Sequence, residues 1–491
     1  MSSWIATVLI FFPVAAALVC WLVPMRRFTL GAFATLAALV EVGFWIVAAE
    51  RFDYGEASGR LQLERQGSWF ADLGVTYHVG FLPYALWLAG MAVVVMAAAI
   101  AYAFWVGRER PRAYFGLMLF LTGAVVGVFA AQDLLLFYVF LEAMLIPLYV
   151  LMGVWGGANR LAATIKFVIY TMAGSLLMLG SVIAFGLQRG TFDLTKIGQS
   201  GSTWLFLGFA AAFAVKAPLF PFHGWLPDAY RESPPEVAAV LSGVISKTAA
   251  YGFIRISLAQ FDTPRHVNSP VHELRTTILV LATIGLIYGS ILAFRAPDVR
   301  GVVAYSSMAQ MGLITLGIFA TNYSGLTGAV LQMVNHGLIS ATLFLLAGAI
   351  ERRAATGEFA RLGGFARGRP ALATMLLVTG VVALAVPGST AFAGEFLILL
   401  GVFVQGWMWA ALGAVAIVLA AMYMLRLISG VLHRDPAPTV EESVLDLRPA
   451  EIGILVPLVA LLLFLSIWPA AITDHSFGTG SRGFPGLASF R

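Results

Sequence analysis

Two lysines and two glutamates of this chain lie inside apolar stretches that are long enough to cross a membrane. Lys216 and Lys247 are two of only four lysines in the sequence, and Glu142 and Glu395 have similar surroundings. A charge at the bilayer centre costs about 2.5 to 3.5 kcal/mol on insertion scales, so such residues face a bundle interior and are typically functional. A desolvated lysine can lose its proton near neutral pH, and a desolvated glutamate can gain one. These residue types therefore predict a path for protons through the protein core.

The helical rise places these groups at similar depths. Lys216 lies about twelve residues into its predicted helix and Lys247 about twelve residues beyond Pro235, each roughly 18 Å from a helix end. Glu142, about nine residues past Asp133, lies roughly 13 Å in. Groups at one depth form a row along the membrane plane, in which each charge influences the protonation of the next. A proton relay needs such a row.

Composition sets the fold class. With 60% hydrophobic and 11% charged residues, the chain is predicted to be an all-α polytopic membrane protein without a sizeable soluble domain. Apolar runs of about twenty residues predict about 14 transmembrane helices. The lipid bilayer is then a partner, and the basic residues orient loops rather than bind nucleic acid. Cys20 is the only cysteine, so neither a disulfide nor an iron–sulfur cluster can form within the chain.

Loop charges predict the topology. Lys and Arg are about twice as frequent in the loops of one side, which the positive-inside rule assigns to the cytoplasm, so both termini are expected on the outer side. Residues 1–24 carry no early positive charge, and Arg26 and Arg27 follow the apolar run. This order favours a retained first helix over a cleaved signal peptide.

Two predicted helices, the seventh and the twelfth, are interrupted by proline. Pro218 and Pro221 follow Lys216, and Pro387 and Gly388 precede Glu395. Backbone that is freed in this way is tolerated at membrane depth only inside protein or beside a wet cavity. Paired breaks indicate two inverted repeats of five helices each, with the site at the breaks. The expected parts are an N-terminal three-helix segment, a first repeat, a second repeat, and a last helix with its tail, at residues 1–112, 113–262, 263–435 and 436–491.

Five motifs carry a resemblance to a known family. They are the stretches Gln132–Glu142 (QDLLLFYVFLE), Lys216–Asp228 (KAPLFPFHGWLPD), Tyr305-Ser-Ser, Asn335-His336-Gly-Leu and Pro387–Phe396 (PGSTAFAGEF). Together they resemble the antiporter-like subunit M, or chain 4, of respiratory complex I, NADH:quinone oxidoreductase, over about residues 113–432. This superfamily also contains Mrp-type sodium/proton antiporter subunits. The sister subunits L and N and the Mrp subunits carry lysine at the twelfth-helix break, so Glu395 favours subunit M.

The resemblance implies a role for each residue of the relay. Glu142 would pair with Lys216, Lys247 and His336 would continue the path, and Glu395 would be the terminal group. It also implies a proton-translocating subunit in the inner (plasma) membrane of a prokaryote, with subunits of the L and N type as neighbours. Electron transfer would occur in partner subunits, which hold NADH, FMN, iron–sulfur clusters and quinone. No cofactor is expected in this chain.

Two of the departures from the family pattern concern histidines. Gln310 replaces a histidine of the tenth helix, and Tyr230 replaces the histidine that closes the Leu-Pro-Asp-Ala motif. Glutamine cannot titrate, so a relay past position 310 would need water or a hydrogen-bonded hop.

Three alternatives remain open. The fold could serve a membrane-bound hydrogenase or a related dehydrogenase, or a multisubunit sodium/proton antiporter. It could also be an inert scaffold, in which Glu142 and Lys216 form a static ion pair and His336 is a packing residue. The scaffold predicts that a neutral replacement of Lys216 leaves transport intact.

Overall fold

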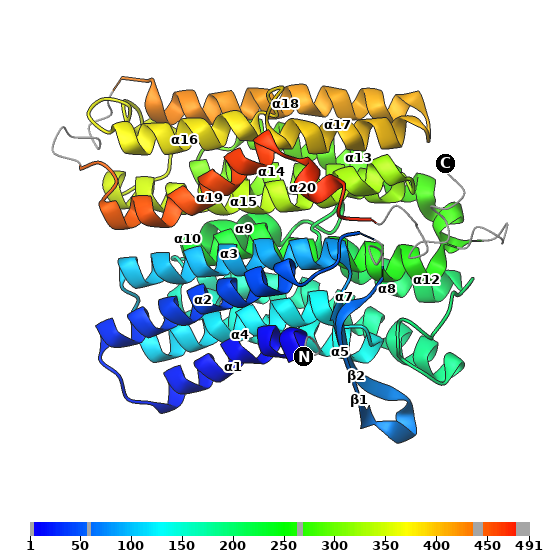
Figure 1. Cartoon of the computed structure of the whole chain (residues 1–491). Coiled ribbons are helices and arrows are strands. Elements are labelled where there is room, and N and C mark those ends of the chain that lie inside the picture. Colours follow the sequence, from blue (N-terminus) through cyan, green and yellow to red (C-terminus); the bar gives the residue numbers. More distant parts are fainter. Residues whose placement is uncertain (1–3, 56–59, 263–268, 436–444, 478–491) are drawn as a thin grey trace.

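The computed structural model describes residues 4–55, 60–262, 269–435 and 445–477, and its helices run side by side in one bundle (Figure 1). Twelve helices among these residues are long and apolar enough to cross a membrane. Three shorter apolar helices, α8 (Thr203–Lys216), α16 (Pro370–Ala383) and α17 (Thr390–Phe403), lie among them. The all-α, multi-pass fold is thus confirmed, whereas the count of 14 and the division into inverted repeats stay predictions.

The remaining elements follow in chain order. The N-terminal part contains α1 (Ile5–Leu22), α2 (Arg27–Glu50), the strands β1 (Gln62–Phe70) and β2 (Val75–Phe81), and α3 (Pro83–Val106). Next come α4 (Pro111–Ala130), α5 (Leu134–Ala143), α6 (Leu145–Trp155), α7 (Arg160–Arg189) and, after α8, α9 (Leu226–Glu232). One continuous helix follows, made of α10 (Pro235–Val240), η3 (Leu241–Ile245), α11 (Ser246–Gly252), η4 (Phe253–Leu258) and α12 (Ala259–Phe261). The chain continues with α13 (Pro270–Arg295), α14 (Val299–Phe319), α15 (Tyr323–Ala354), α18 (Trp407–Leu432), α19 (Pro449–Ile467) and α20 (Ala470–Thr473).

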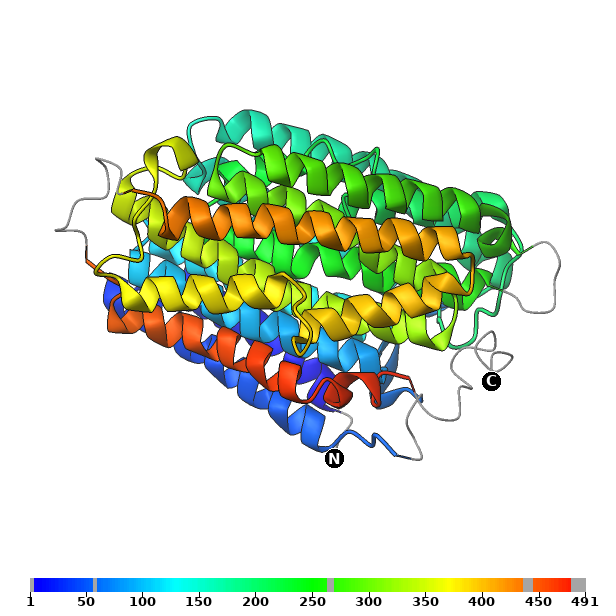
Figure 2. The ribbon, with the colours of Figure 1, turned by 90° about the horizontal axis from the view of Figure 1, so that it is seen from above.

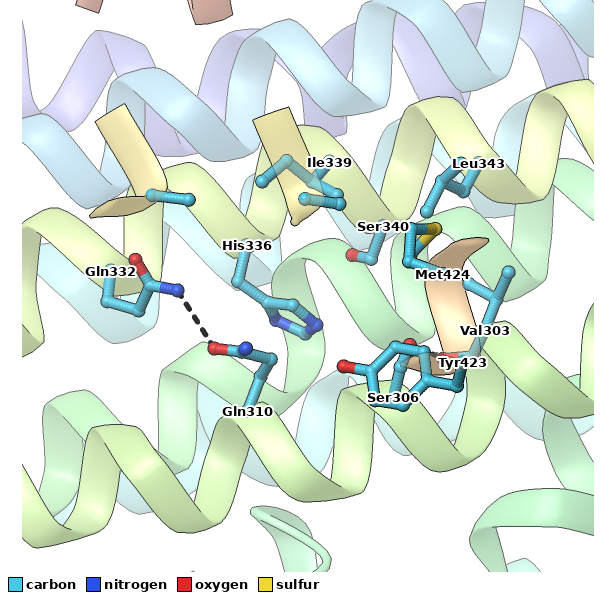
Figure 3. Close-up of a pocket in the computed structure, with 12 residues that line it drawn as sticks. Val303, Ser306, Gln310, Gln332, His336, Ile339, Ser340, Leu343, Tyr423 and Met424 are labelled. Carbon is cyan, nitrogen blue, oxygen red and sulfur yellow. Dashed lines mark hydrogen bonds between the residues drawn. The ribbon is translucent and has the colours of Figure 1, made fainter. Parts of the chain in front are cut away.

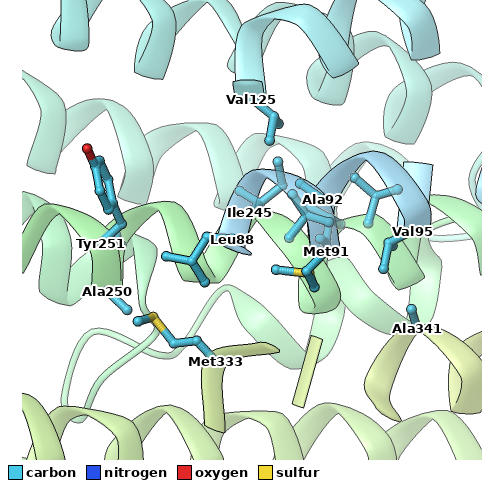
Figure 4. Packing of buried hydrophobic residues seen from close by; sticks show 14 of the residues in the cluster. Leu88, Met91, Ala92, Val95, Val125, Ile245, Ala250, Tyr251, Met333 and Ala341 are labelled. Atoms are coloured by element: carbon cyan, nitrogen blue, oxygen red, sulfur yellow. The ribbon is translucent and has the colours of Figure 1, made fainter. Parts of the chain in front are cut away.

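The most buried helices are those that carry Lys247 and His336. Along their apolar windows, the helix Pro235–Phe261 and helix α15 are 100% buried, whereas α1, α2 and α18 are less than half buried. Leu88 and Met91 of α3 lie close to Ile245 and Met333 in this centre (Figure 4). A helix that is apolar on all sides belongs in the interior of a bundle. Polar groups on the two central helices are therefore shielded from lipid.

The first helix break lies directly after Lys216. Helix α8 ends at this residue and α9 begins ten residues later, at Leu226. Pro218 cannot donate a backbone hydrogen bond, so the helix cannot continue regularly. The indole Nε1 of Trp225 donates to the carbonyl oxygen of Val215 at 2.9 Å and so satisfies one of the freed groups. The break leaves the Lys216 side chain at a helix end inside the bundle.

The second break separates α16 from α17, which lie end to end with the break between them (Figure 2). Ser389 caps α17, because its hydroxyl accepts from the Phe392 amide at 3.2 Å. The Thr390 amide donates to the hydroxyl of Ser466 on α19 at 2.9 Å. Gly388 has a φ of +96°, a conformation that side chains rarely adopt. Thr390 at the start of α17 is buried, and Glu395 lies in the second turn of this helix. Val386, Pro387 and Gly388 are exposed, so the second break lies at the surface of the described bundle rather than inside it, unlike the sequence expectation.

A β-hairpin, which the sequence analysis does not predict, lies at one end of the bundle (Figure 1). His78 of β2 lies between two carboxylates, with Nε2 2.8 Å from Glu64 and Nδ1 3.2 Å from Asp193. Burial acts to raise the pKa of Asp193, but the contact with His78 and the hydrogen bonds from Thr195 outweigh it and hold that pKa below its ordinary value. The ionised carboxylate thus ties the hairpin to the loop between α7 and α8.

Candidate functional site

Glu142 and Lys216 form an ion pair next to the first helix break. The Lys216 Nζ donates to Glu142 Oε1 at 3.0 Å and to the Leu141 carbonyl oxygen at 3.3 Å. The hydroxyl of Ser175 on α7 donates to the same Glu142 oxygen at 2.5 Å. Lys216 is 3% exposed and the Glu142 side chain 24%, so the ammonium is the more deeply buried partner. Residues from α5, α7 and α8 thus meet at one carboxylate.

Lys247 lies in a helix whose hydrogen bonding is disturbed on both sides. The segments η3 and η4, which flank α11, are π-helical, and such bulges are frequent at functional sites. The Lys247 Nζ donates to the Ser242 carbonyl oxygen at 2.5 Å and lies 2.6 Å from His336 Nδ1. No carboxylate of the described residues forms an ion pair with Lys247. The π-helical turn supplies a carbonyl acceptor in place of a counter-ion.

The contact between Lys247 and His336 limits how many protons the pair can hold. Two unit charges 2.6 Å apart repel each other by about 6 kcal/mol at an effective dielectric constant of about 20. This cost is about two to four times the roughly 1.5 to 3 kcal/mol of a hydrogen bond to a charged group. The geometry therefore fits one proton shared between the two side chains, with the imidazole Nδ1 as acceptor. Such a pair can pass a proton from one residue to the other.

Glu395 is buried in a network of amide side chains. Its Oε1 accepts from Gln310 Nε2 at 2.9 Å, and Gln310 Oε1 accepts from Gln332 Nε2 at 2.8 Å. Gln332 also lies in contact with Asn335, whose amide donates to the Thr390 carbonyl oxygen at the start of α17. Glu395 is 1% exposed, and its Oε2 has no hydrogen-bond partner among the described residues. The network fixes one oxygen and leaves the other available.

A small cavity lies between His336 and the amide network. Its volume is about 20 Å³, and a site of roughly 10 to 15 Å³ is enough for a water molecule. His336, Gln310, Gln332, Ser306 and Tyr423 are among its lining residues, and the imidazole points into the space between them (Figure 3). The Nε2 of His336 has no hydrogen-bond partner in the described part of the chain. The cavity thus joins His336 to Gln310 and Gln332, which contact Glu395, although Glu395 itself does not line it.

The five predicted site residues thus fall into three groups. Glu142 contacts Lys216, Lys247 contacts His336, and Glu395 contacts Gln310. Within the residues that the structure describes, no direct hydrogen bond joins Lys216 to Lys247 or His336 to Glu395. A proton that moves along the row has to cross these two gaps through water or side-chain motion.

Sequence reasoning missed several residues of the site. The sequence around Ser175 did not indicate a contact with Glu142, because a serine in a long apolar helix can also be a simple packing residue. Gln332 precedes His336 by four residues, so both lie on one helix face, and this spacing could have pointed to it. Asn335 was part of a recognised motif but received no role.

A further buried cation, Arg255, lies in the same helix as Lys247. Its Nε and Nη2 donate to Gln132 Oε1 at 3.2 and 2.7 Å, and the residue is 7% exposed. No carboxylate of the described residues forms an ion pair with it. Arg255 follows Lys247 by eight residues, or roughly 12 Å along the helix, toward the end of the bundle that carries the β-hairpin.

Comparisons with known proteins agree with this architecture. The family described as "NADH:quinone oxidoreductase/Mrp antiporter, TM" matches residues 131–420. NADH-quinone oxidoreductase subunit M of Rhodobacter capsulatus is 35% identical over 440 residues, which cover 86% of this chain and 84% of the relative.

Solved structures show the same fold over nearly the whole chain. A chain of respiratory complex I from Thermus thermophilus with bound NADH matches with a TM-score of 0.86 at 28% identity, covering 98% of this chain and 99% of that one. A chain of the Mrp complex from Dietzia sp. DQ12-45-1b matches with a TM-score of 0.81 at 21% identity, covering 98% and 97%, and shows the fold alone. The chain therefore belongs to the transmembrane family of NADH:quinone oxidoreductase and Mrp antiporter subunits, in its NADH-quinone oxidoreductase subunit M branch.

Proposed function

We propose that this chain is a proton-translocating membrane subunit of NADH:quinone oxidoreductase. Protons move through Glu142, Lys216, Lys247, His336 and Glu395 while partner subunits carry electrons from NADH to quinone. The proposal rests on the contact between Lys247 Nζ and His336 Nδ1. A proton shared across this 2.6 Å distance is suited to proton transfer, whereas packing alone does not require it. A buried cation without a counter-ion costs stability, and an apolar residue would pack at lower cost.

Transport would begin at the ion pair. A conformational or electrostatic push from the redox partners would open the 3.0 Å contact between Glu142 and Lys216. Without the adjacent anion, the buried ammonium is less stable and releases its proton toward Lys247. Lys216 then reloads from the cytoplasmic side. The hydrogen bond from Ser175 holds Glu142 in the position to which the lysine returns.

The second half of the path leads through the cavity. Lys247 passes the proton to His336 Nδ1, and the imidazole releases a proton from Nε2 on the cavity side. Water in the cavity would carry it past Gln310 to the free Oε2 of Glu395, which discharges it outside. Moving one charge against the membrane potential costs about 2.3 kcal/mol per 100 mV. This work has to come from the partner subunits.

Arg255 would keep the path from leaking. A proton that left Lys247 along its own helix toward the hairpin end would approach the Arg255 guanidinium. At roughly 12 Å and an effective dielectric constant of about 20, two unit charges repel by about 1.4 kcal/mol, and more as they come closer. Fixed cations exclude protons from other membrane pores in the same way. The barrier favours lateral transfer to His336.

We infer the assembly from the family of the chain. The neighbours would be membrane subunits of complex I of the L and N type, and NADH, FMN, iron–sulfur clusters and quinone would be held by partner subunits. The positive-inside rule places both termini on the outer side of a prokaryotic inner membrane. The end with the β-hairpin then faces outward.

The test is proton pumping by the parent complex in reconstituted vesicles. Lys216→Ala and Glu142→Gln should each abolish most pumping in a fully assembled complex. Arg112→Ala is the matched control, because Arg112 is exposed and forms no ion pair in the described structure. Arg353 would be a poor control, since it binds Glu451 at 2.6 Å.

Unimpaired pumping with Lys216→Ala would refute the relay and support the scaffold alternative. Transport that required Na⁺ in the wild-type complex would instead favour sodium/proton antiport, since the matching family includes Mrp antiporter subunits.

A further inference from the structure

An open pocket of about 240 Å³ lies where three membrane helices end on the basic side of the bundle. Figure 1 shows the end of α3 and the start of α19 at the same end of the molecule. The pocket is lined by residues from the last turns of α3 and α15, from the segment that leads into α19 and from the first turn of α19, namely Trp105, Arg352, Arg353, Leu445, Arg448 and Glu451. This site is separate from the relay and independent of the proposed function.

The charges around the pocket do not cancel. Arg353 Nη1 and Nη2 donate to the two Glu451 oxygens at 3.0 and 2.6 Å, so this pair is neutral as a unit. Arg352 and Arg448 are exposed, and no ion pair or side-chain hydrogen bond links either guanidinium to another described residue. The Arg448 guanidinium lies over the Trp105 ring, 5.6 Å from its centroid. Two guanidinium groups therefore remain to bind an anion.

The pocket has the chemistry of a phosphate site at the membrane surface. Guanidinium groups bind phosphate oxygens in pairs of parallel hydrogen bonds. The Glu451 carboxylate already caps the start of α19, because its Oε2 accepts from the Arg448 amide at 2.8 Å, so the two arginine side chains are the groups that would hold the anion. Tryptophan is enriched at the level of lipid headgroups, and basic pockets between transmembrane helices on the cytoplasmic side bind anionic headgroups. We propose that this pocket binds the phosphate group of an anionic phospholipid.

Photolabelling of the parent complex tests the proposal. The purified complex in neutral detergent receives phosphatidylglycerol with a photoreactive group near its headgroup, and labelled peptides are identified by mass spectrometry. We expect labels near Trp105 and between Leu445 and Glu451. The variant Arg352→Gln with Arg448→Gln should bind the probe about 30-fold more weakly, or about 2 kcal/mol at roughly 1 kcal/mol for each arginine. The matched control is Arg112→Gln with Arg434→Gln.

Competition identifies the source of the phosphate. Unlabelled phosphatidylglycerol should displace the probe, whereas phosphatidylcholine and millimolar inorganic phosphate should not. If inorganic phosphate displaced the probe, the pocket would be an anion site, but the proposal that it binds a phospholipid would be overturned. A lysine pair, Arg352→Lys with Arg448→Lys, should give an intermediate loss because it keeps the charge but not the paired hydrogen bonds.

Two results would overturn the proposal outright. One is equal labelling in the Arg352→Gln/Arg448→Gln variant and in the control variant, both assembled on native gels. The other is a wild-type complex that is not labelled at this pocket, which would mean that another subunit covers it.

Discussion

The substitution Lys247→Arg separates a proton carrier from a fixed charge. Arginine keeps the positive charge next to His336, but a guanidinium does not release a proton under physiological conditions. If Lys247 only stabilises packing through its charge, arginine should replace it. If Lys247 passes a proton to His336 across the 2.6 Å contact, arginine should block the path.

The expected loss follows from acid strength. In model peptides a guanidinium is a weaker acid than a lysine ammonium by about two pKa units or more, and each unit is about 1.36 kcal/mol. Proton transfer to His336 from an arginine at this position is therefore at least about 2.9 kcal/mol less favourable than transfer from the native Lys247, which is roughly a 100-fold loss. We expect Lys247→Arg to pump no better than Lys247→Met, which keeps the side-chain length without a charge.

The assay measures proton uptake and quinone reduction in the same vesicles. Native gels confirm that the variant complexes assemble, because the site is fully buried and a larger side chain can disturb packing. His336→Gln serves as a second variant, since it keeps an acceptor near Lys247 but cannot carry a proton. Near wild-type pumping with Lys247→Arg would show that the charge alone suffices, and the single-proton argument would be wrong.

Three further predictions test other parts of the chain. Gln310→Leu removes a hydrogen bond to the Glu395 carboxyl, worth about 1.5 to 3 kcal/mol, so pumping should slow by roughly tenfold or more while native gels still show assembly. Arg255→Gln should raise the passive proton leak about tenfold, as measured by pH decay in vesicles without substrate, because a barrier of about 1.4 kcal/mol is lost; an unchanged leak would count against the barrier. Asp193→Asn should speed hydrogen exchange in the β-hairpin at pH 7, because the pKa of Asp193 is lowered in the folded protein and its ionised carboxylate therefore stabilises the fold. This stabilisation is fully present above the unfolded-state pKa of about 3.9 and is lost as the pH falls through the lower folded-state pKa. Equal exchange in both proteins at pH 7 would show that the contact with His78 does not hold the hairpin.

The sequence was sufficient for the class of fold and for the burial of Lys216, Lys247 and Glu395, whereas their depth in a membrane stays a prediction. Apolar runs of helical length have one stable arrangement in lipid, and a lysine in the middle of such a run has to face the interior. Pro218 and Pro387 marked where helices end for the same local reason, the loss of a backbone donor. These features depend on neighbouring residues, so they can be read along the chain.

Contacts between distant helices could not be read in this way. Lys216 and Glu142 are 74 residues apart, and only the resemblance to a family suggested that they meet. The π-helical turns around Lys247 left no recognisable signal, since their residues also suit a regular helix. The β-hairpin was overlooked although β2 alternates regularly between apolar and polar residues, because β1 carries polar residues on both faces.

The glutamine at position 310 shows how the structure changes a conclusion drawn from the sequence. As a residue that cannot titrate, Gln310 looked like an interruption of the path. In the structure its amide donates to Glu395 and accepts from Gln332, so both ends are used to hold the terminal carboxyl in place. The cavity beside it connects His336 with this network. In the proposed relay the proton would not need to pass through Gln310 itself, because the amide would orient the accepting carboxyl while water in the adjacent cavity would carry the charge.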